Sequence, residues 1–126
     1  MKWLRINAVV AMHQRQIAEH GGSEGVRDLG LLESALARPE NIAAYEPEAD
    51  IARLTGAYAF GIAKNHPFID GNKRTALVAM RTFLRLNGFN LNATPADKYL
   101  TIISLAEGSL SEEDLVDWLR ERILKA

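Results

Sequence analysis

The sequence predicts an all-α protein, a compact bundle of about six helices that forms a single domain over residues 1–126. Three observations support this fold class. Apolar residues recur at helical spacing through most of the chain, glycine and proline interrupt that spacing at intervals, and no segment alternates like a convincing strand. A chain of 126 residues can bury one hydrophobic core without covalent help, and this one has no cysteine.

The first predicted helix follows a short extended lead-in of residues 1–6. It begins with Asn7 as its N-cap, runs to about Glu19 and ends at the glycine pair that starts with Gly21. His13 falls on the apolar face of this helix. One interpretation is a histidine at the edge of the core that bonds a backbone carbonyl, and the other is a support for the polar loop described below.

The second predicted helix has Asp28 as its N-cap and is expected to stop at Pro39. Residues 39–47 are then a connecting loop. Arg27 and Asp28 are interpreted as a cap with a local ion pair, and the alternative is that they form part of a substrate cleft.

The third predicted helix, from about Asp50 to Lys64, is expected to lie at the centre of the bundle. Several of its residues are small and would let neighbouring helices approach closely; they are Ala57, Ala59, Gly61 and Ala63. A fourth helix is expected over residues 73–87. A fifth begins with Thr94 as cap and Pro95 at its first position, and a sixth begins at Ser111, before an acidic first turn.

Between the third and fourth helices, the stretch from His66 to Arg74 reads HPFIDGNKR. The proline after His66 favours an extended backbone there, and Asn72 is expected to cap the next helix. Gly71 can adopt a positive φ, which would turn successive backbone N–H groups inward as an anion-binding nest. Lys73 and Arg74 lie in the first helical turn, where the dipole disfavours each cation by roughly 0.3–1 kcal/mol. A bound anion, phosphate above all, would offset this arrangement.

Two further side chains of the stretch suit phosphate chemistry. Asp70 is a suitable ligand for a Mg²⁺ ion that bridges phosphate oxygens. His66 is available as a general base, a role that typically contributes about 10²–10⁴-fold to a rate. Base, metal-binding carboxylate and anion-binding helix start together indicate phosphoryl or nucleotidyl transfer to a hydroxyl group.

The same stretch resembles the core motif of the Fic/Doc superfamily. The longer Fic form reads H-P-F-x-x-G-N-G-R-x-x-R, and this chain differs from it at Lys73 and Leu77. Both differences move it toward the Doc (death-on-curing) branch, whose motif is H-x-F-x-x-[AG]-N-K-R. The length and layout of the whole chain are similar to Doc toxins as well.

The resemblance implies a toxin of a Phd/Doc-type toxin–antitoxin pair. Such toxins are small all-α kinases that use ATP and Mg²⁺ to phosphorylate a threonine of elongation factor Tu, which stops translation. By position, His66 would be the catalytic base and Asp70 the Mg²⁺ ligand. The phosphate grip would be formed by Gly71, Asn72, Lys73 and Arg74.

Two alternatives remain open on the sequence. One is an AMP transferase of the Fic type, although a lysine at position 73 would fill the space that glycine leaves for the α- and β-phosphates, so that the nucleotide enters reversed. The other is a catalytically silent helical module that only binds a partner.

The resemblance also implies a regulator. Many Fic enzymes carry an inhibitory helix with the pattern [S/T]-x-x-x-E-[G/N], which this chain lacks, so inhibition is expected from a Phd-like antitoxin whose C-terminal segment occupies a groove. Arg81 and Arg85 form a basic stripe that is either a contact for it or a solvated face. The net charge of −1 gives no general attraction to nucleic acid, and no apolar run is long enough for a membrane span. No signal peptide is recognisable either, so a cytoplasmic protein is expected.

Overall fold

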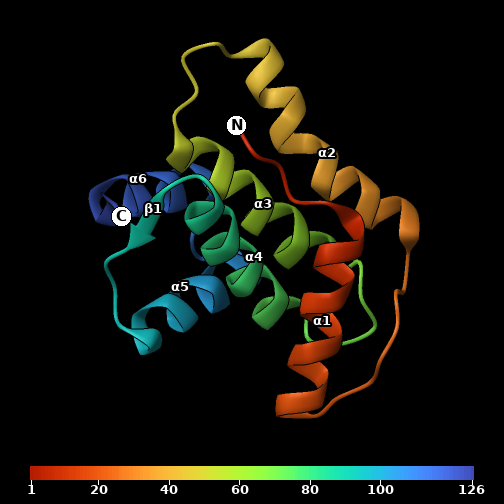
Figure 1. Cartoon of the computed structure of the whole chain (residues 1–126). Helices are drawn as coiled ribbons and strands as arrows, with labels where there is room; N and C mark the ends of the chain where they lie inside the picture. The colour runs from red at the N-terminus through yellow and green to blue at the C-terminus, as the bar shows by residue number, and fades with distance from the viewer.

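The structure, a computed structural model, describes all of residues 1–126. It contains six α-helices and one short two-stranded antiparallel sheet (Figure 1). The elements in chain order are α1 (Ile6–His20), α2 (Leu29–Tyr45), α3 (Ile51–Asn65), α4 (Asn72–Leu86), β1 (Phe89–Leu91), α5 (Pro95–Glu107), α6 (Glu112–Arg122) and β2 (Ile123–Lys125). The predicted all-α bundle is confirmed. None of the helices combines the length and the apolar character that crossing a bilayer requires.

Helix α3 lies in the middle of the molecule, as its small residues predict (Figure 1). It packs against α2, α4, α5 and α6. Gly61 explains the close approach of α2, because a Cβ atom there would lie 3.0 Å from the Cβ of Ala35. At Gly56 a Cβ atom would lie only 2.7 Å from a methyl group of Val116, so the close packing of α6 on α3 also requires a glycine. Because α3 is held on several sides, the loop at its C-terminal end starts from a fixed position.

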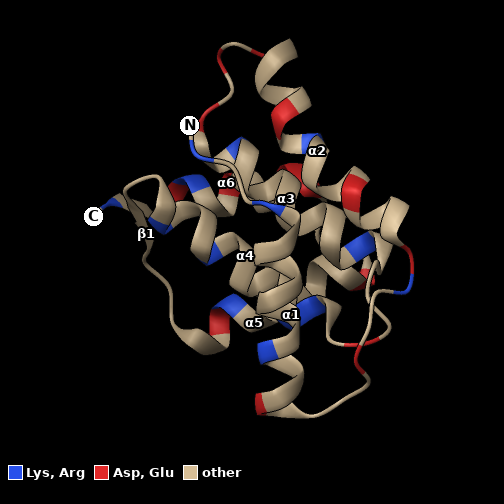
Figure 2. Cartoon of the chain, turned by 45° about the vertical axis from the view of Figure 1, so that its right-hand side comes forward, with Lys and Arg blue, Asp and Glu red and all other residues tan.

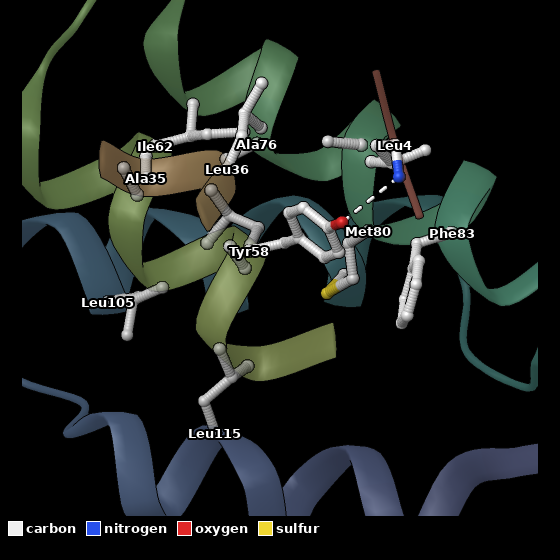
Figure 3. Packing of buried hydrophobic residues seen from close by; sticks show 14 of the residues in the cluster. Leu4, Ala35, Leu36, Tyr58, Ile62, Ala76, Met80, Phe83, Leu105 and Leu115 are labelled. Atoms are coloured by element: carbon white, nitrogen blue, oxygen red, sulfur yellow. Dashed lines mark hydrogen bonds between the residues drawn. The ribbon is translucent and has the colours of Figure 1, made fainter. Parts of the chain in front are cut away.

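The N-terminal lead-in is anchored on this core (Figure 3). The backbone N–H of Leu4 donates to the hydroxyl of the fully buried Tyr58, at 3.1 Å. Burial raises the pKa of Tyr58 to about 12, so the phenol stays protonated. Trp3 stacks on Phe83 with ring centroids 5.9 Å apart. The first turn of α1 therefore begins beside the core, at Ile6 rather than after an Asn7 cap, and its N-cap residue makes no side-chain hydrogen bond.

The predicted end of the second helix at Pro39 is wrong, since α2 continues to Tyr45 with Pro39 inside it. Pro39 is buried, and the preceding Arg38 donates two hydrogen bonds of 2.7 Å to Glu112 of α6. Glu112 also accepts a 2.9 Å bond from Arg53 of α3. Tertiary contacts of this kind compensate for the hydrogen bond that a proline removes from a helix.

Both charge signs occur on α1, α2, α5 and α6, whereas α3 and α4 carry only cations (Figure 2). Several ion pairs join separate parts of the chain. The β1–β2 pairing was not predicted; it sets Phe89 opposite Lys125 and fastens the C-terminus beside the end of α4. Strands of three residues are too short to show an alternating pattern. The predicted caps Thr94 and Ser111 are confirmed, because each hydroxyl accepts a bond from the backbone three residues ahead.

Candidate active site

The loop between α3 and α4 borders a cleft of about 300 Å³. Residues of α1, the loop, α4 and α5 line this cleft. It brings together all six site residues predicted from the sequence, which are His66, Asp70, Gly71, Asn72, Lys73 and Arg74. A larger cavity of about 1110 Å³ lies elsewhere, between the N-terminal segment and α2, and its lining is mostly apolar. We place the chemistry in the smaller cleft because the histidine, the carboxylate and the cations of the motif meet there.

His66 ends α3 in the left-handed conformation, with φ 49° and ψ 57°. It is the one residue other than glycine with a positive φ, and the predicted extended backbone is therefore wrong. Such a conformation costs of the order of 1–3 kcal/mol and persists only where the surroundings hold it. Arg27 does so from the chain segment before α2. Its Nε donates to the His66 carbonyl at 2.7 Å, and its Nη2 donates to the Asn65 carbonyl at 2.8 Å.

The segment before α2 also pairs with the loop through its backbone. Val26 and Phe68 form an isolated antiparallel bridge. The N–H of Arg27 donates to the Pro67 carbonyl at 2.8 Å, and that of Ile69 donates to Gly25 at 3.0 Å. The expected local ion pair of Arg27 with its neighbour is wrong, because the Arg27 guanidinium is bonded to loop carbonyls. The adjacent Asp28 caps α2 as predicted, by accepting from the N–H of Leu31.

His13, on α1, supports the loop through ring stacking and a hydrogen bond. Its ring is buried and stacks on the fully buried Phe68, with centroids 3.9 Å apart and planes 5° from parallel. Its Nε2 lies 2.7 Å from the Asp70 carbonyl. A carbonyl can only accept, so Nε2 carries a proton and donates. The two interpretations offered for His13 are thus the same contact: a buried histidine bonds a backbone carbonyl, and that carbonyl belongs to the loop.

Asn72 closes the loop instead of capping α4. Its side-chain oxygen accepts from the N–H of Phe68 at 2.9 Å, and its amide nitrogen donates to the Phe68 carbonyl at 3.0 Å. The predicted N-cap is therefore wrong: Asn72 is the first helical residue, and the cap position is taken by Gly71 at φ 73°. The side chain makes no bond at the helix start because it is turned back to Phe68. The predicted positive φ at Gly71 is confirmed.

The start of α4 presents unpaired donors to the cleft. The backbone N–H groups of Asn72, Lys73 and Arg74 have no acceptor within the chain. Neither Lys73 nor Arg74 belongs to any of the salt bridges of the chain. The Arg74 guanidinium lies over the ring of Tyr99, 5.0 Å from its centroid. This combination of free N–H groups, helix dipole and unpaired cations suits a phosphate group.

Asp70 supplies the only carboxylate among the lining residues. Its Oδ1 accepts from the N–H of Gly71 at 2.8 Å, and its Oδ2 lies 3.3 Å from the N–H of Ser23. These bonds orient the carboxylate and leave lone pairs for a cation. One carboxylate beside a phosphate site fits Mg²⁺, which keeps several waters and takes its remaining ligands from substrate phosphates. Gly22 makes this placement possible, because a Cβ atom there would lie 2.6 Å from Oδ2.

Sequence reasoning missed the cleft residues that lie outside the motif. They are Gln16, Ile17, His20 and Gly21 at the end of α1 and, on α5, Tyr99. No sequence signal points to Tyr99, since it lies far along the chain from the motif and meets Arg74 only through the packing of α5 on α4. The end of α1 carried one cue, the pair Gly21 and Gly22, both with positive φ, which lets the chain turn tightly beside Asp70.

Comparison with known proteins agrees with this geometry. Residues 3–84 match the model of the Fic/DOC family. The chain is 33% identical over 120 residues to "Protein kinase doc" of Escherichia phage P1, an alignment that covers 95% of this chain and 94% of the relative. It is 46% identical over 77 residues to "Toxin Doc" of Mycolicibacterium smegmatis, covering 58% of this chain and 57% of that protein. The chain therefore belongs to the Fic/DOC family.

Proposed function

We propose that this protein is a Doc-type toxin that transfers the γ-phosphate of ATP to a threonine hydroxyl of elongation factor Tu. Translation in the cytoplasm would stop as a result. The observation that carries the proposal is the convergence in one cleft of an exposed histidine, one carboxylate and two unpaired cations at a helix start. The similarity over nearly the full length to a relative named a protein kinase supports a phosphotransferase.

In this proposal the start of α4 holds the triphosphate. The free N–H groups of Asn72, Lys73 and Arg74 would donate to phosphate oxygens, and the side chains of Lys73 and Arg74 would neutralise their charge. Asp70 would hold Mg²⁺, which would supply charge neutralisation to the triphosphate. Gly71 suits the close packing of the loop on α1, because its φ is 73° and a Cβ atom there would lie 3.1 Å from the Cδ1 of Ile17.

His66 acts as the general base. Its ring is solvent-exposed and lines the cleft, so a protein hydroxyl can reach it. The imidazole accepts the threonine proton while the hydroxyl oxygen attacks the γ-phosphorus. The bond from that phosphorus to the β-phosphate oxygen breaks, and ADP leaves with the electron pair. A base of this kind typically accounts for about 10²–10⁴-fold of the rate.

Transfer of AMP is the second candidate. It would place the α-phosphorus beside His66, and Lys73 bears on the choice because its side chain stands at the helix start that the phosphates approach. A silent binding module is less well supported, since plain helix capping gives no reason for the strained backbone of His66.

Incubation with elongation factor Tu, Mg²⁺ and ATP labelled at the α- or the γ-phosphate separates the candidates. We expect label on the factor only from the γ-position, and mass spectrometry should place it on a threonine. The His66→Ala variant is the control and should lose nearly all transfer. Label only from the α-position would contradict the kinase, and no label from either position would leave the binding module.

A Phd-like antitoxin is the proposed regulator, and its C-terminal segment would occupy the large apolar cavity. That cavity runs beside α2 and has exposed apolar side chains on its rim, with Met1 64%, Leu29 54% and Leu86 42% exposed. Covering such surface contributes about 25 cal/mol per Å². Arg81 and Arg85 line a smaller and more polar cleft of about 230 Å³ and offer less to an amphipathic segment.

Two variants test this placement. Leu29→Asp adds a charge at the first residue of α2, where the helix dipole favours an acid. We expect it to weaken antitoxin binding strongly while the protein stays folded. The double variant Arg81→Ala/Arg85→Ala should bind the antitoxin nearly as well as the unaltered chain. The reverse pattern would assign the antitoxin to the basic stripe.

A further inference from the structure

We infer that Arg27 is a positioning residue for His66, which it holds in the left-handed conformation that presents the imidazole to the cleft. The inference deepens the proposed function, because it takes His66 to be the catalytic base. Arg27 lies 39 positions away from His66 in sequence and does not line the cleft itself. It acts through the loop backbone.

The first support is the set of groups that Arg27 binds. The last carbonyls of a helix have no partner inside the helix. Arg27 takes two of them, Asn65 at 2.8 Å and His66 at 2.7 Å, with two nitrogens of one planar guanidinium. Arg27 forms no salt bridge with any carboxylate. Its side chain is committed to these two carbonyls.

The second support is that the backbone of Arg27 is fixed to the same loop. Its backbone N–H donates to the carbonyl of Pro67 at 2.8 Å, and Pro67 directly follows His66, whose carbonyl accepts from the Arg27 side chain. The adjacent Val26 forms the bridge with Phe68. The side chain of Arg27 therefore starts from a backbone that is fixed beside the loop, which keeps its guanidinium within reach of the Asn65 and His66 carbonyls.

The third support is a division of roles within the loop. Asn72 holds Phe68 through two bonds, and His13 holds the Asp70 carbonyl. Neither contact involves His66. Loss of the Arg27 side chain would therefore release His66 toward the extended backbone that a residue before proline prefers. The phosphate-binding start of α4 would stay in place.

This division predicts a specific kinetic change. In Arg27→Gln we expect kcat for phosphate transfer to fall about 10- to 100-fold, a part of the ~10²–10⁴ that a general base contributes. KM for ATP should stay within about twofold, since the triphosphate is held by the other end of the loop. For Arg27→Lys we expect a kcat between those of the unaltered protein and Arg27→Gln, because an ammonium group lacks the planar fork that reaches both carbonyls. Arg15→Gln is the matched control, an exposed arginine paired only with Glu19, and should leave both constants unchanged.

A second readout does not depend on activity. In isotope-labelled protein, the three-bond coupling between the His66 amide and α protons reports φ, and the ring resonances report its surroundings. We expect both to change in Arg27→Gln and to be retained in Arg15→Gln. Unchanged His66 signals together with unchanged kcat would overturn the inference. So would a fall in kcat accompanied by an equal rise in KM and a general loss of folded signals, which would make Arg27 merely structural.

The two readouts separate this inference from the proposed function. If the unaltered protein transfers no phosphate, the kinase proposal fails on its own. The coupling measurement then still decides whether Arg27 sets the conformation of residue 66.

Discussion

Replacement of Gly22 by alanine tests the geometry of the cleft most directly. A Cβ atom at this position would lie 2.6 Å from Oδ2 of Asp70 and 3.2 Å from its Cγ. Ordinary contact begins at 3.4 Å, so the carboxylate must retreat by about 0.8 Å, the difference between 3.4 and 2.6 Å. The carboxylate is the free end of a flexible side chain and gives way more easily than backbone. The Cβ atom would also lie 3.2 Å from the Cδ1 of Ile17, the end of a flexible side chain that need shift only by a few tenths of an ångström, so the main displacement falls on the proposed Mg²⁺ ligand.

A misplacement of about 1 Å at a reacting centre can lower a rate by about 10²-fold. We expect Gly22→Ala to reduce phosphate transfer to elongation factor Tu by about 10- to 100-fold, with a higher Mg²⁺ concentration needed for half-maximal rate. The assay is the initial rate at saturating ATP over a series of Mg²⁺ concentrations. Thermal unfolding of the same samples confirms that each variant is folded at the assay temperature.

Gly88→Ala is the matched control, because Gly88 does not line the cleft. Gly88 also has a positive φ, of 87°, but a Cβ atom there would meet nothing within 4 Å. Alanine at either site costs stability because of the positive φ, by about 1–3 kcal/mol. Only the change at Gly22 should alter the rate of the folded protein. Equal rates for the two variants would refute the role given to Asp70.

Three further predictions follow from other contacts. The hydrogen bonds from Arg120 lower the pKa of the Asp50 carboxyl in the folded protein. The pair therefore stabilises the protein fully above the ordinary carboxyl pKa of about 3.8, and this stabilisation is lost as the pH falls through the lower pKa of the folded state. Arg120→Gln should accordingly lower the free energy of unfolding at neutral pH, and urea titrations should find the difference from the unaltered chain vanishing at strongly acidic pH. Gly61→Val should destabilise the protein by about 1–3 kcal/mol in urea unfolding, because even a Cβ atom would lie 3.1 Å from the Cα of Ala35. His13→Phe keeps an aromatic ring but removes the donor to the loop carbonyl, so we expect a lower kcat with the melting temperature changed by only a few degrees; an unaltered kcat would show that this bond does not position the loop.

The helix caps illustrate what the sequence could predict. The predicted caps Asp28, Thr94 and Ser111 each accept a bond from the backbone three residues ahead. Such contacts involve only neighbours in the chain, which is why these caps could be read from the sequence, although the caps predicted at Asn7 and Asn72 were wrong. The small residues of the third helix were equally informative, because a close helix approach needs a missing side chain whichever helix approaches. The chemistry of the motif could also be predicted from the sequence, because its residues are consecutive in the chain.

The incorrect predictions share another cause. Pro39 remains inside a helix because α6 and α3 hold that turn, and His66 is left-handed because Arg27 holds it. Asn72 gives up the cap position for two bonds to Phe68. In the first two cases a contact from outside the local segment outweighs a local preference of one or a few kcal/mol, and at Asn72 the closed geometry of the loop itself outweighs the preference for a cap.

The sequence by itself determined the helices, the central place of the third one and the nine-residue stretch that carries the reactive groups. Tertiary structure alone decided how that stretch is held. Arg27 binds the His66 carbonyl, His13 binds the Asp70 carbonyl, and the Arg74 guanidinium lies over the ring of Tyr99. Periodicity and capping are set by neighbours along the chain and can be read there. The grip on the loop is formed by residues distant in sequence, whose pairing exists only once the helices have packed.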